Sequence, residues 1–365
     1  MKVPYSYLPR QFKDPDPILA DIRELVVKGA LTLGQPVEAF EEEFAQFIGA
    51  KHAIAVGSGT DALFLSLKAH GIGQGDEVIT AANTFVATAG AIETAGARIR
   101  FVDCNNQYVM DVDKVEAAIT EHTKAIMPVH YTGQPVDMEA LEQVALRHNL
   151  LIIEDACTAI DGAIGGRRCG TMSAAAGFSM HPLKNLNIWG DGGVITTNSK
   201  DLRDKLRLMR NHGMSSRDVY DFYAYNSRLD TIQAVVARRL LKDVRWITDR
   251  RIENAHRFDA AFSQIPEIRV PRRSTNERHV YHLYIVEADR RDQLLAFLKE
   301  QGISAKIHYP TPLHLQPASA GLGYGKGDFP LAEAQAKRMI SLPVHQHLTH
   351  EEMAYMIEKV QEFYG

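Results

Sequence analysis

The chain has 365 residues, of which 45% are apolar and 24% charged, and its formal net charge is −4. This is the composition of an ordinary globular protein with enough apolar residues for a large core, and the length suggests about two domains. Acidic and basic residues are spread along the chain, which argues against the basic stripe of a nucleic-acid-binding surface.

No apolar run near the N-terminus resembles a signal peptide, and no stretch reaches the ~18 apolar residues of a membrane-spanning helix. The cysteines are Cys104, Cys157 and Cys169, too few for a disulfide framework and without a CxxC pair. We therefore expect a cytoplasmic protein with reduced thiols and no membrane partner.

Short apolar runs alternate with helical patterns over much of the chain. The expected strands are His52–Val56, Glu77–Ile79, Arg98–Val102, Ala125–Val129, Leu150–Ile153, Gly177–Met180 and Val194–Thr197. The expected helices are Asp61–His70, Ala87–Thr94, Val112–Ile119, Met138–His148 and Asp201–Asn211. This alternation predicts an α/β fold whose central sheet is mostly parallel and flanked by helices.

A helical pattern without Pro or Gly then runs from Asp230 to Phe262, and a single helix of that length often bridges two domains. Beyond it, we expect a βαβ-like unit, a Gly-rich loop and two closing helices, over His282–Val286, Asp292–Glu300, Ser304–His308, Leu315–Phe329, Ala332–Met339 and Glu351–Phe363. The predicted domains are a large one over residues 1–250, with its N-terminal segment free to pack elsewhere, and a smaller α/β one over residues 251–365.

Lys184 follows an apolar strand and a proline, Pro182, which cannot continue a sheet ladder. Glycines follow before the next strand, so the lysine lies in a turn that can face a cleft. A partly desolvated lysine has a lowered pKa and can act as an amine nucleophile. The same local pattern is also typical of a solvated loop lysine.

Two further segments lie where ligands bind in α/β folds. Asp155 follows a buried strand, and a carboxylate at that edge can pair with a protonated pyridine nitrogen or cap the next segment. Gly57–Thr60 joins a strand to a helix, where backbone N–H groups bind phosphate. This segment has neither the GxGxxG nor the GxxxxGKS pattern, so a dinucleotide site and a P-loop are not predicted.

Other polar and aromatic residues leave two interpretations open. Phe85 can stack on a flat ring or belong to the core. Arg228 can bind an anionic group or be structural. His308 and His314 lie in a proline-containing loop without HxxxH or HExxH spacing, so no metal site is predicted. Glu154 should project away from Asp155 and be structural.

Taken in order, these segments resemble the DegT/StrS family of sugar aminotransferases, which are pyridoxal-phosphate enzymes of fold type I. The matching segments, which span almost the whole chain, are Leu33–Glu41, Gly57–Leu63, Gly75–Ile79, Thr84–Thr88, Glu154–Ala156, Phe178–Asn185, Gly192–Gly193, Tyr225–Asp230 and His308–Pro317. The resemblance implies pyridoxal 5′-phosphate as cofactor and a homodimer with active sites at the interface.

The resemblance also assigns roles to residues. Lys184 matches the catalytic lysine that holds the cofactor as a Schiff base and moves protons, Asp155 matches the partner of the pyridine nitrogen, and Phe85 matches the stacking ring. The implied phosphate contacts are Gly59, Thr60, Ser179 and, from the other subunit, Asn226. The candidate substrate-side residues are Trp189, Arg228, His308, Tyr309 and His314.

Three positions depart from the family pattern. Thr158 stands where a glutamine often contacts the cofactor, and Ile160 stands where histidine is common. Trp189 stands where smaller residues are frequent, so it is expected to reshape the sugar pocket. The sequence of His181–Asn185 resembles that of a branch of the family that acts on keto-hexoses without a nucleotide.

The expected reaction moves an amino group, with L-glutamate as donor, to a keto-sugar that is a nucleotide-linked or phosphorylated hexose. The acceptor alternatives are a non-nucleotide 3-keto-hexose 6-phosphate and a cyclitol ketone. A sugar dehydratase of the same fold is disfavoured because such relatives replace the lysine with histidine. A non-catalytic regulatory relative is disfavoured because Lys184 and Asp155 are both present.

Overall fold

The computed structural model describes residues 1–365 and is built around a seven-stranded sheet with the order β1-β9-β8-β5-β4-β2-β3. Its strands are β1 (His52–Val56), β2 (Glu77–Ala81), β3 (Arg98–Val102), β4 (Thr123–Ile126), β5 (Leu151–Asp155), β8 (Ala175–Ser179) and β9 (Gly193–Thr197). The strands from β3 to β8 are parallel, whereas β9 is antiparallel to both β8 and β1. The expected mostly parallel α/β sheet is confirmed.

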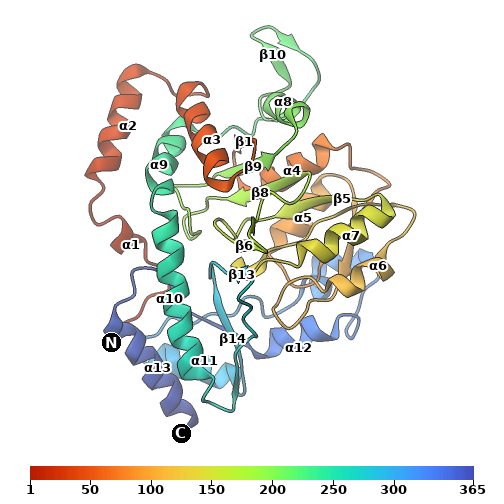
Figure 1. Ribbon diagram of the computed structural model, residues 1–365. Coiled ribbons are helices and arrows are strands. Elements are labelled where there is room, and N and C mark those ends of the chain that lie inside the picture. The colour runs from red at the N-terminus through yellow and green to blue at the C-terminus, as the bar shows by residue number, and fades with distance from the viewer.

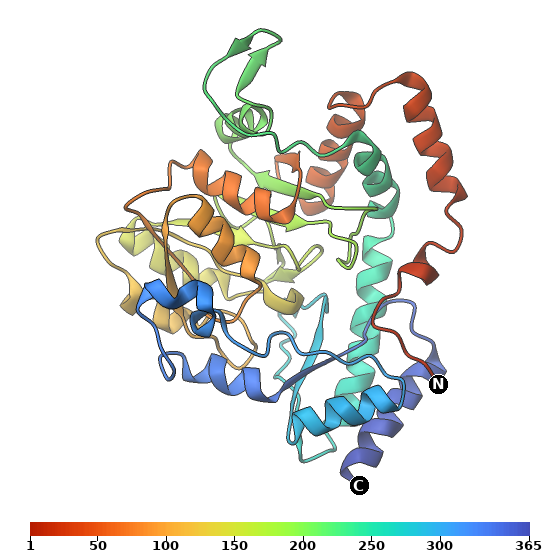
Figure 2. The ribbon, with the colours of Figure 1, turned by 180° about the vertical axis from the view of Figure 1, so that it is seen from behind.

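Helices cover both faces of this sheet. Figure 2 shows α4 (Gly59–Ala69) and α5 (Val86–Thr94) on one face, and Figure 1 shows α3 (Gln35–Ile48) and α7 (Met138–His148) on the other. Further helices around this sheet are α1 (Leu8–Gln11), α2 (Asp16–Lys28), α6 (Val115–Ala118) and α8 (Lys200–Met209). The short strands β6 (Ala163–Ile164), β7 (Arg167–Arg168) and β13 (Glu277–Arg278) form a small three-stranded sheet, and β10 (Met214–Ser216) pairs with β11 (Val219–Tyr220) in a hairpin.

The turn from β1 into α4 lies directly against the first residue of β9. Ser58 caps α4, since its Oγ accepts a hydrogen bond from the Asp61 N–H at 3.0 Å. A Cβ built on Gly193 would lie 2.1 Å from the Ser58 carbonyl oxygen, so no larger residue fits there. Glycine at position 193 therefore lets the start of α4 reach the strand ends.

The prediction of a single helix over Asp230–Phe262 is wrong. The structure has α9 (Thr231–Leu241) and α10 (Val244–Phe262), and at the break the Asp243 N–H donates to the Leu240 carbonyl, a tight i−3 turn. The two helices pack on different partners, α9 on α2 and α3 and α10 on α13 (His350–Tyr364). The break lets each half follow its own partner.

The prediction of a βαβ-like unit is also wrong, because the C-terminal sheet is antiparallel. It consists of β12 (Ile268–Arg269), β14 (Tyr284–Ala288) and β15 (Met339–Leu342), with α11 (Arg291–Glu300) packed on β14 and β15 and α13 packed on α11. The expected strand Ser304–His308 makes only an isolated bridge, through Lys306 to Ser341. The helix expected to reach Met339 ends earlier, as α12 (Pro330–Arg338), and the Gly-rich segment contains a 3₁₀ helix over Pro317–Leu322.

The C-terminal part has a hydrophobic core of its own. Phe258, Phe262, Tyr284 and Met356 are fully buried in it, and Val3 from the N-terminal segment packs into it as well. The domain boundary at residue 250 stays a prediction that this separate core supports. In no helix does an apolar stretch reach the length needed to cross a membrane.

Substitution of Gly193 by Ala should lower the free energy of unfolding by about 1–3 kcal/mol, because the new Cβ overlaps the Ser58 carbonyl. Gly90 is the matched control: it lies within α5, has no atom within 4 Å of a built Cβ, and should gain about 0.5–1 kcal/mol on change to Ala. Urea denaturation of both variants measures this. Equal stabilities would contradict the close approach at Gly193.

Candidate active site

A cavity of about 380 Å³ lies at the carboxyl ends of β1, β5 and β8. This is the edge at which open α/β sheets bind ligands. The structure brings most of the predicted site residues to its wall, namely Gly59, Thr60, Phe85, Asp155, Thr158, Ser179, Lys184, His308 and Tyr309. The other predicted residues, Trp189, Asn226, Arg228 and His314, do not line it.

Asp155 is the last residue of β5 and is only 4% exposed. Its Oδ2 accepts a hydrogen bond from Thr88 Oγ1 at 2.7 Å, and its Oδ1 accepts one from the Cys157 N–H at 3.1 Å. These two bonds fix the plane of the carboxylate against the cavity wall. Thr88 was not among the predicted site residues, although its position one helical turn after Phe85 was a usable signal.

Lys184 lies in the connection between β8 and β9, and its backbone is anchored on both sides. Its N–H donates to the His181 carbonyl at 2.8 Å, and its carbonyl accepts from the Tyr7 hydroxyl at 2.9 Å. The side-chain amine makes no hydrogen bond or ion pair within the chain. Burial lowers the pKa of Lys184, with Cys157 and Asp155 acting in the opposite direction, and so favours the neutral amine that a nucleophile needs.

The start of α4 offers donors to an anion. The N–H groups of Gly59 and Thr60 have no partner within the chain, as is usual for the first turn of a helix. A Cβ built on Gly59 would lie 2.7 Å from the Cβ of Ser179, so glycine here lets the helix start lie against the end of β8. Two free backbone donors and a nearby hydroxyl form an arrangement suited to phosphate.

The Phe85 ring is 52% exposed at the cavity wall, so it is not a core residue. Its centroid lies 6.0 Å from that of Tyr309. The Thr158 hydroxyl donates to the His130 carbonyl at 2.7 Å and is thereby committed to the protein. Ile160, the other departure from the family pattern, is buried.

Two of the predicted substrate-side residues are held away from the cavity by their own packing. His314 is 2% exposed, and its Nε2 lies 3.1 Å from Glu333 Oε1 while its ring meets Phe329 edge-on. Trp189 exchanges two backbone hydrogen bonds with the Gln233 side chain, and its ring packs edge-on against Phe12. Neither position reaches the cavity in this chain.

The segment before α9, which carries Asn226 and Arg228, also lies outside the cavity wall. Asn226 is exposed, and Arg228 donates from Nη1 to Asn211 Oδ1 at 3.0 Å. A backbone bridge between Val56 and Arg228 holds the segment beside the end of β1. The cofactor role of Asn226 and the anion-binding role of Arg228 stay predictions.

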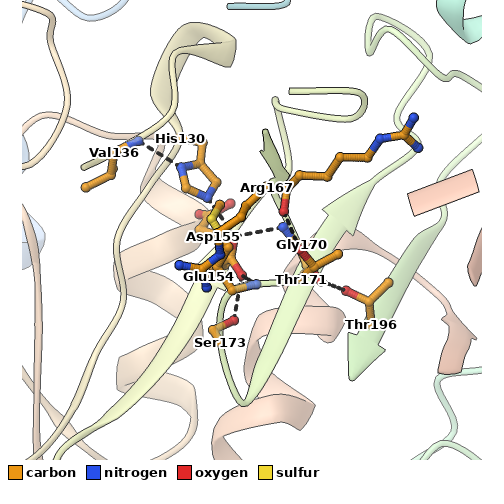
Figure 3. A network of polar contacts seen from close by, with 12 residues as sticks. His130, Val136, Glu154, Asp155, Arg167, Gly170, Thr171, Ser173 and Thr196 are labelled. Atoms are coloured by element: carbon orange, nitrogen blue, oxygen red, sulfur yellow. Dashed lines mark hydrogen bonds and ion pairs between the residues drawn. The ribbon is translucent and has the colours of Figure 1, made fainter. Parts of the chain in front are cut away.

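Glu154 is fully buried and structural, as expected. Figure 3 shows its carboxylate among His130, Gly170 and Ser173, and the distances are 2.9 Å to His130 Nε2, 2.7 Å to the Gly170 N–H and 2.7 Å to Ser173 Oγ. The Met172 N–H adds a fourth contact at 2.9 Å. This network fixes the segment after β7 against β5, next to Asp155.

Comparison with known proteins defines first the class and then the family. The crystal structure of DesV from S. venezuelae in complex with a ketimine intermediate has a TM-score of 0.97 and 38% identity, covering 100% of this chain and 98% of that one. The chain has the fold of a pyridoxal-phosphate-dependent sugar aminotransferase. Residues 14–361 match the DegT/DnrJ/EryC1/StrS aminotransferase family, and the chain belongs to this family.

Two relatives illustrate the range of names in the family. A pleiotropic regulatory protein of Geobacillus stearothermophilus is 43% identical over 100% of this chain and 99% of its own length. A dTDP-3-amino-3,4,6-trideoxy-alpha-D-glucose transaminase of Streptomyces venezuelae is 39% identical over 94% of this chain and 91% of its own length. The family, fold and enzyme class expected from the sequence are confirmed.

Substitution of Thr88 by Val should lower kcat/KM by about 10- to 100-fold, because the Asp155 carboxylate loses the hydrogen bond that orients it. The control is Ser66→Ala, which removes a buried hydroxyl whose hydrogen bond to the Ala62 carbonyl lies within α4. Steady-state kinetics on both folded variants measures the difference. Wild-type kinetics in the Thr88→Val protein would exclude an orienting role.

The buried His345 should make the protein less stable in acid. Burial lowers the pKa of His345 to about 3, from an ordinary value near 6.5, so between these values the unfolded chain binds more protons. The free energy of unfolding should therefore fall as the pH drops below ~6.5, by up to about 1.4 kcal/mol per pH unit. Urea denaturation between pH 7 and 4 tests this, and a His345→Gln variant should show a shallower slope. Parallel slopes would contradict it.

Proposed function

We propose that this chain transfers an amino group from L-glutamate to a nucleotide-linked keto-hexose and so makes an amino-sugar. The observation that carries the proposal is the meeting of Lys184, Asp155 and the start of α4 in one cavity. The relative from Streptomyces venezuelae is named for a dTDP-linked sugar, which favours a nucleotide-linked acceptor over a 3-keto-hexose 6-phosphate or a cyclitol ketone.

The cavity fits pyridoxal 5′-phosphate on its own chemistry. Gly59 and Thr60 supply the free N–H donors for the phosphate with Ser179 beside them, the half-exposed Phe85 offers a ring face, and Asp155 offers a carboxylate for a ring nitrogen. When bound, this cofactor supplies an aldehyde carbon for amine capture and an electron-withdrawing ring.

The chain's own residues then have distinct tasks. Lys184 would hold the cofactor through Nζ and would take and return a proton at that atom; burial lowers the pKa of the amine, which favours its neutral form. Asp155, oriented by Thr88, holds a proton on the ring nitrogen. Phe85 and Tyr309 exclude water from the side of the cavity where they face each other.

We also propose that the chain forms a homodimer whose active sites lie at the interface between the two subunits. The β10–β11 hairpin projects from the body of the chain (Figure 1) and carries or adjoins the exposed aromatic residues Tyr220, Phe222, Tyr223 and Tyr225. Such a surface on an arm is suited to a second copy, and the exposed Asn226 lies next to it. Cross-linking or sedimentation measures the assembly.

A cytoplasmic location completes the proposal. All three cysteines are free, and two of them, Cys104 and Cys169, are buried. Unbridged thiols are typical of a reducing compartment.

Substitution of Lys184 by Ala should lower turnover with L-glutamate and a dTDP-linked keto-hexose by about 10³-fold or more, because no other amine lines the cavity. The exposed Lys124→Ala is the control for loss of a lysine. Absorbance of the purified protein with pyridoxal phosphate, before and after L-glutamate, reports the first half-reaction. Near-wild-type turnover in the Lys184→Ala protein would overturn the mechanism, whereas a wild-type protein that neither forms an absorbance band with pyridoxal phosphate nor turns over would favour a non-catalytic role.

A further inference from the structure

A second, smaller cavity of about 80 Å³ adjoins the active-site cavity. The two share four wall residues, Leu183, His282, Leu283 and His308, and the first of these is next to Lys184. The small cavity is therefore a side pocket behind one wall of the reaction chamber. Its remaining wall is contributed mainly by the N-terminal segment, α10 and the segments on either side of the C-terminal sheet.

Arg251 is the principal charge of this pocket. It lies on α10 and is only 2% exposed. Its Nε donates to Gln346 Oε1 at 3.1 Å and its Nη1 donates to the Tyr281 carbonyl at 3.1 Å, but its Nη2 has no partner. A buried guanidinium normally has all its donors satisfied, because an unmet one costs free energy.

No carboxylate lies on the pocket wall to balance this charge. Burial lowers the pKa of Arg251, and the groups that oppose burial are the hydroxyls of Tyr7 and Tyr5. Glu352, an acid from the neighbouring α13, is occupied by Arg10 at 2.7 Å and by the Thr349 N–H at 3.0 Å. Arg251 is thus a buried cation without a protein counter-ion.

Other wall residues add to the positive and donor character. His282 keeps an Nδ1 atom without a partner, whereas His345 donates from Nε2 to the Pro4 carbonyl, so the Nδ1 of its neutral ring is an acceptor and adds nothing to anion binding. Lys306 lies at the pocket with its Nζ 4.6 Å from the centre of the Tyr5 ring, and it makes no ion pair. These unpartnered nitrogens and a lysine around one small cavity form a site for an anion.

The size of the pocket restricts that anion. A water molecule takes about 30 Å³ of liquid volume, so the pocket has room for a carboxylate and little more. A sugar or a nucleotide is far too large. Because Leu183, His282, Leu283 and His308 line both cavities, the pocket is the nearest place for a carboxylate of an amino acid whose amine lies in the main cavity.

We propose that the pocket around Arg251 is the subsite that binds a carboxylate of the amino-acid donor. This inference rests on the proposed function, and it assigns donor recognition to a place distinct from the acceptor's. Arg251 and Lys306 then control the affinity for the donor and leave that for the keto-sugar unchanged.

The direct test is calorimetric titration of the wild-type holoenzyme with glutarate, which has two carboxylates and no amine to react. Glutaramide, the uncharged analogue of the same length, is the matched control ligand. Binding of glutarate without binding of glutaramide is expected. If glutarate does not bind, or if only chloride does, the pocket is filled by water or by an inorganic ion and the proposal is overturned.

Variants locate the binding. Arg251→Gln should weaken glutarate binding and raise KM for L-glutamate by about 10- to 100-fold, with KM for the keto-sugar unchanged. Arg250→Gln removes the same charge one residue away on the same helix, where Arg250 pairs only with Glu253, and should change neither value. If loss of the Arg251 contacts to the Tyr281 and His282 carbonyls prevents folding, Lys306→Gln is the second variant, since its side chain is exposed. This variant should weaken glutarate binding and raise KM for L-glutamate by a few-fold.

The two proposals fail differently. A wild-type enzyme that uses L-glutamate, with the same donor KM in the Arg251 and Arg250 variants, overturns the carboxylate subsite and leaves the aminotransferase intact. A wild-type enzyme that binds glutarate at Arg251 but transfers no amino group to any keto-sugar overturns the proposed function and leaves the subsite.

Discussion

The site depends on two close approaches around the start of α4, each made possible by a glycine. The turn from β1 into α4 fits against the start of β9 only because Gly193 has no side chain, and the start of α4 lies against the end of β8 only because of Gly59. These approaches bring the free N–H groups of a helix start to the strand ends that carry Asp155. A phosphate-binding helix start and a carboxylate thereby share one cavity, although they are far apart in the sequence.

The surroundings of Lys184 come from distant parts of the chain. Tyr7 from the N-terminal segment binds the Lys184 carbonyl, and the same segment pairs through Val3 with Gly302 and Ser304 in the C-terminal part. His308 and Tyr309, which follow Ser304, form another wall of the cavity. The reaction chamber is therefore closed by segments far apart in the sequence, and Tyr309 packs against the core of the large sheet.

Much of the fold was predictable because its signals are local. Short stretches of sequence are enough to identify the apolar strands of the central sheet and the glycine turn at Gly57–Thr60. The same is true of the residue types at Asp155 and Lys184. The break between α9 and α10 was not, because Lys242 and Asp243 are compatible with a helix and only the different packing partners of the two halves require it. Likewise β15 begins where a helical pattern ends, since β14 offers it an antiparallel edge. The positions of His314 and Trp189 were set by Glu333, Phe329, Gln233 and Phe12, contacts that no local pattern displays.

The reversed direction of β9 has a further consequence. The connection between two parallel strands must run from one end of the sheet to the other. Because β8 and β9 are antiparallel neighbours, residues 180–192 instead leave β8 and enter β9 at the same end of the strands. This segment carries Lys184, and its two ends are fixed by the ladder rather than by its own content. Between these ends, Leu186 and Ile188 are buried in the core of the large sheet, so the segment is a loop held at both ends and in its middle, and the lysine has a fixed place without belonging to a strand.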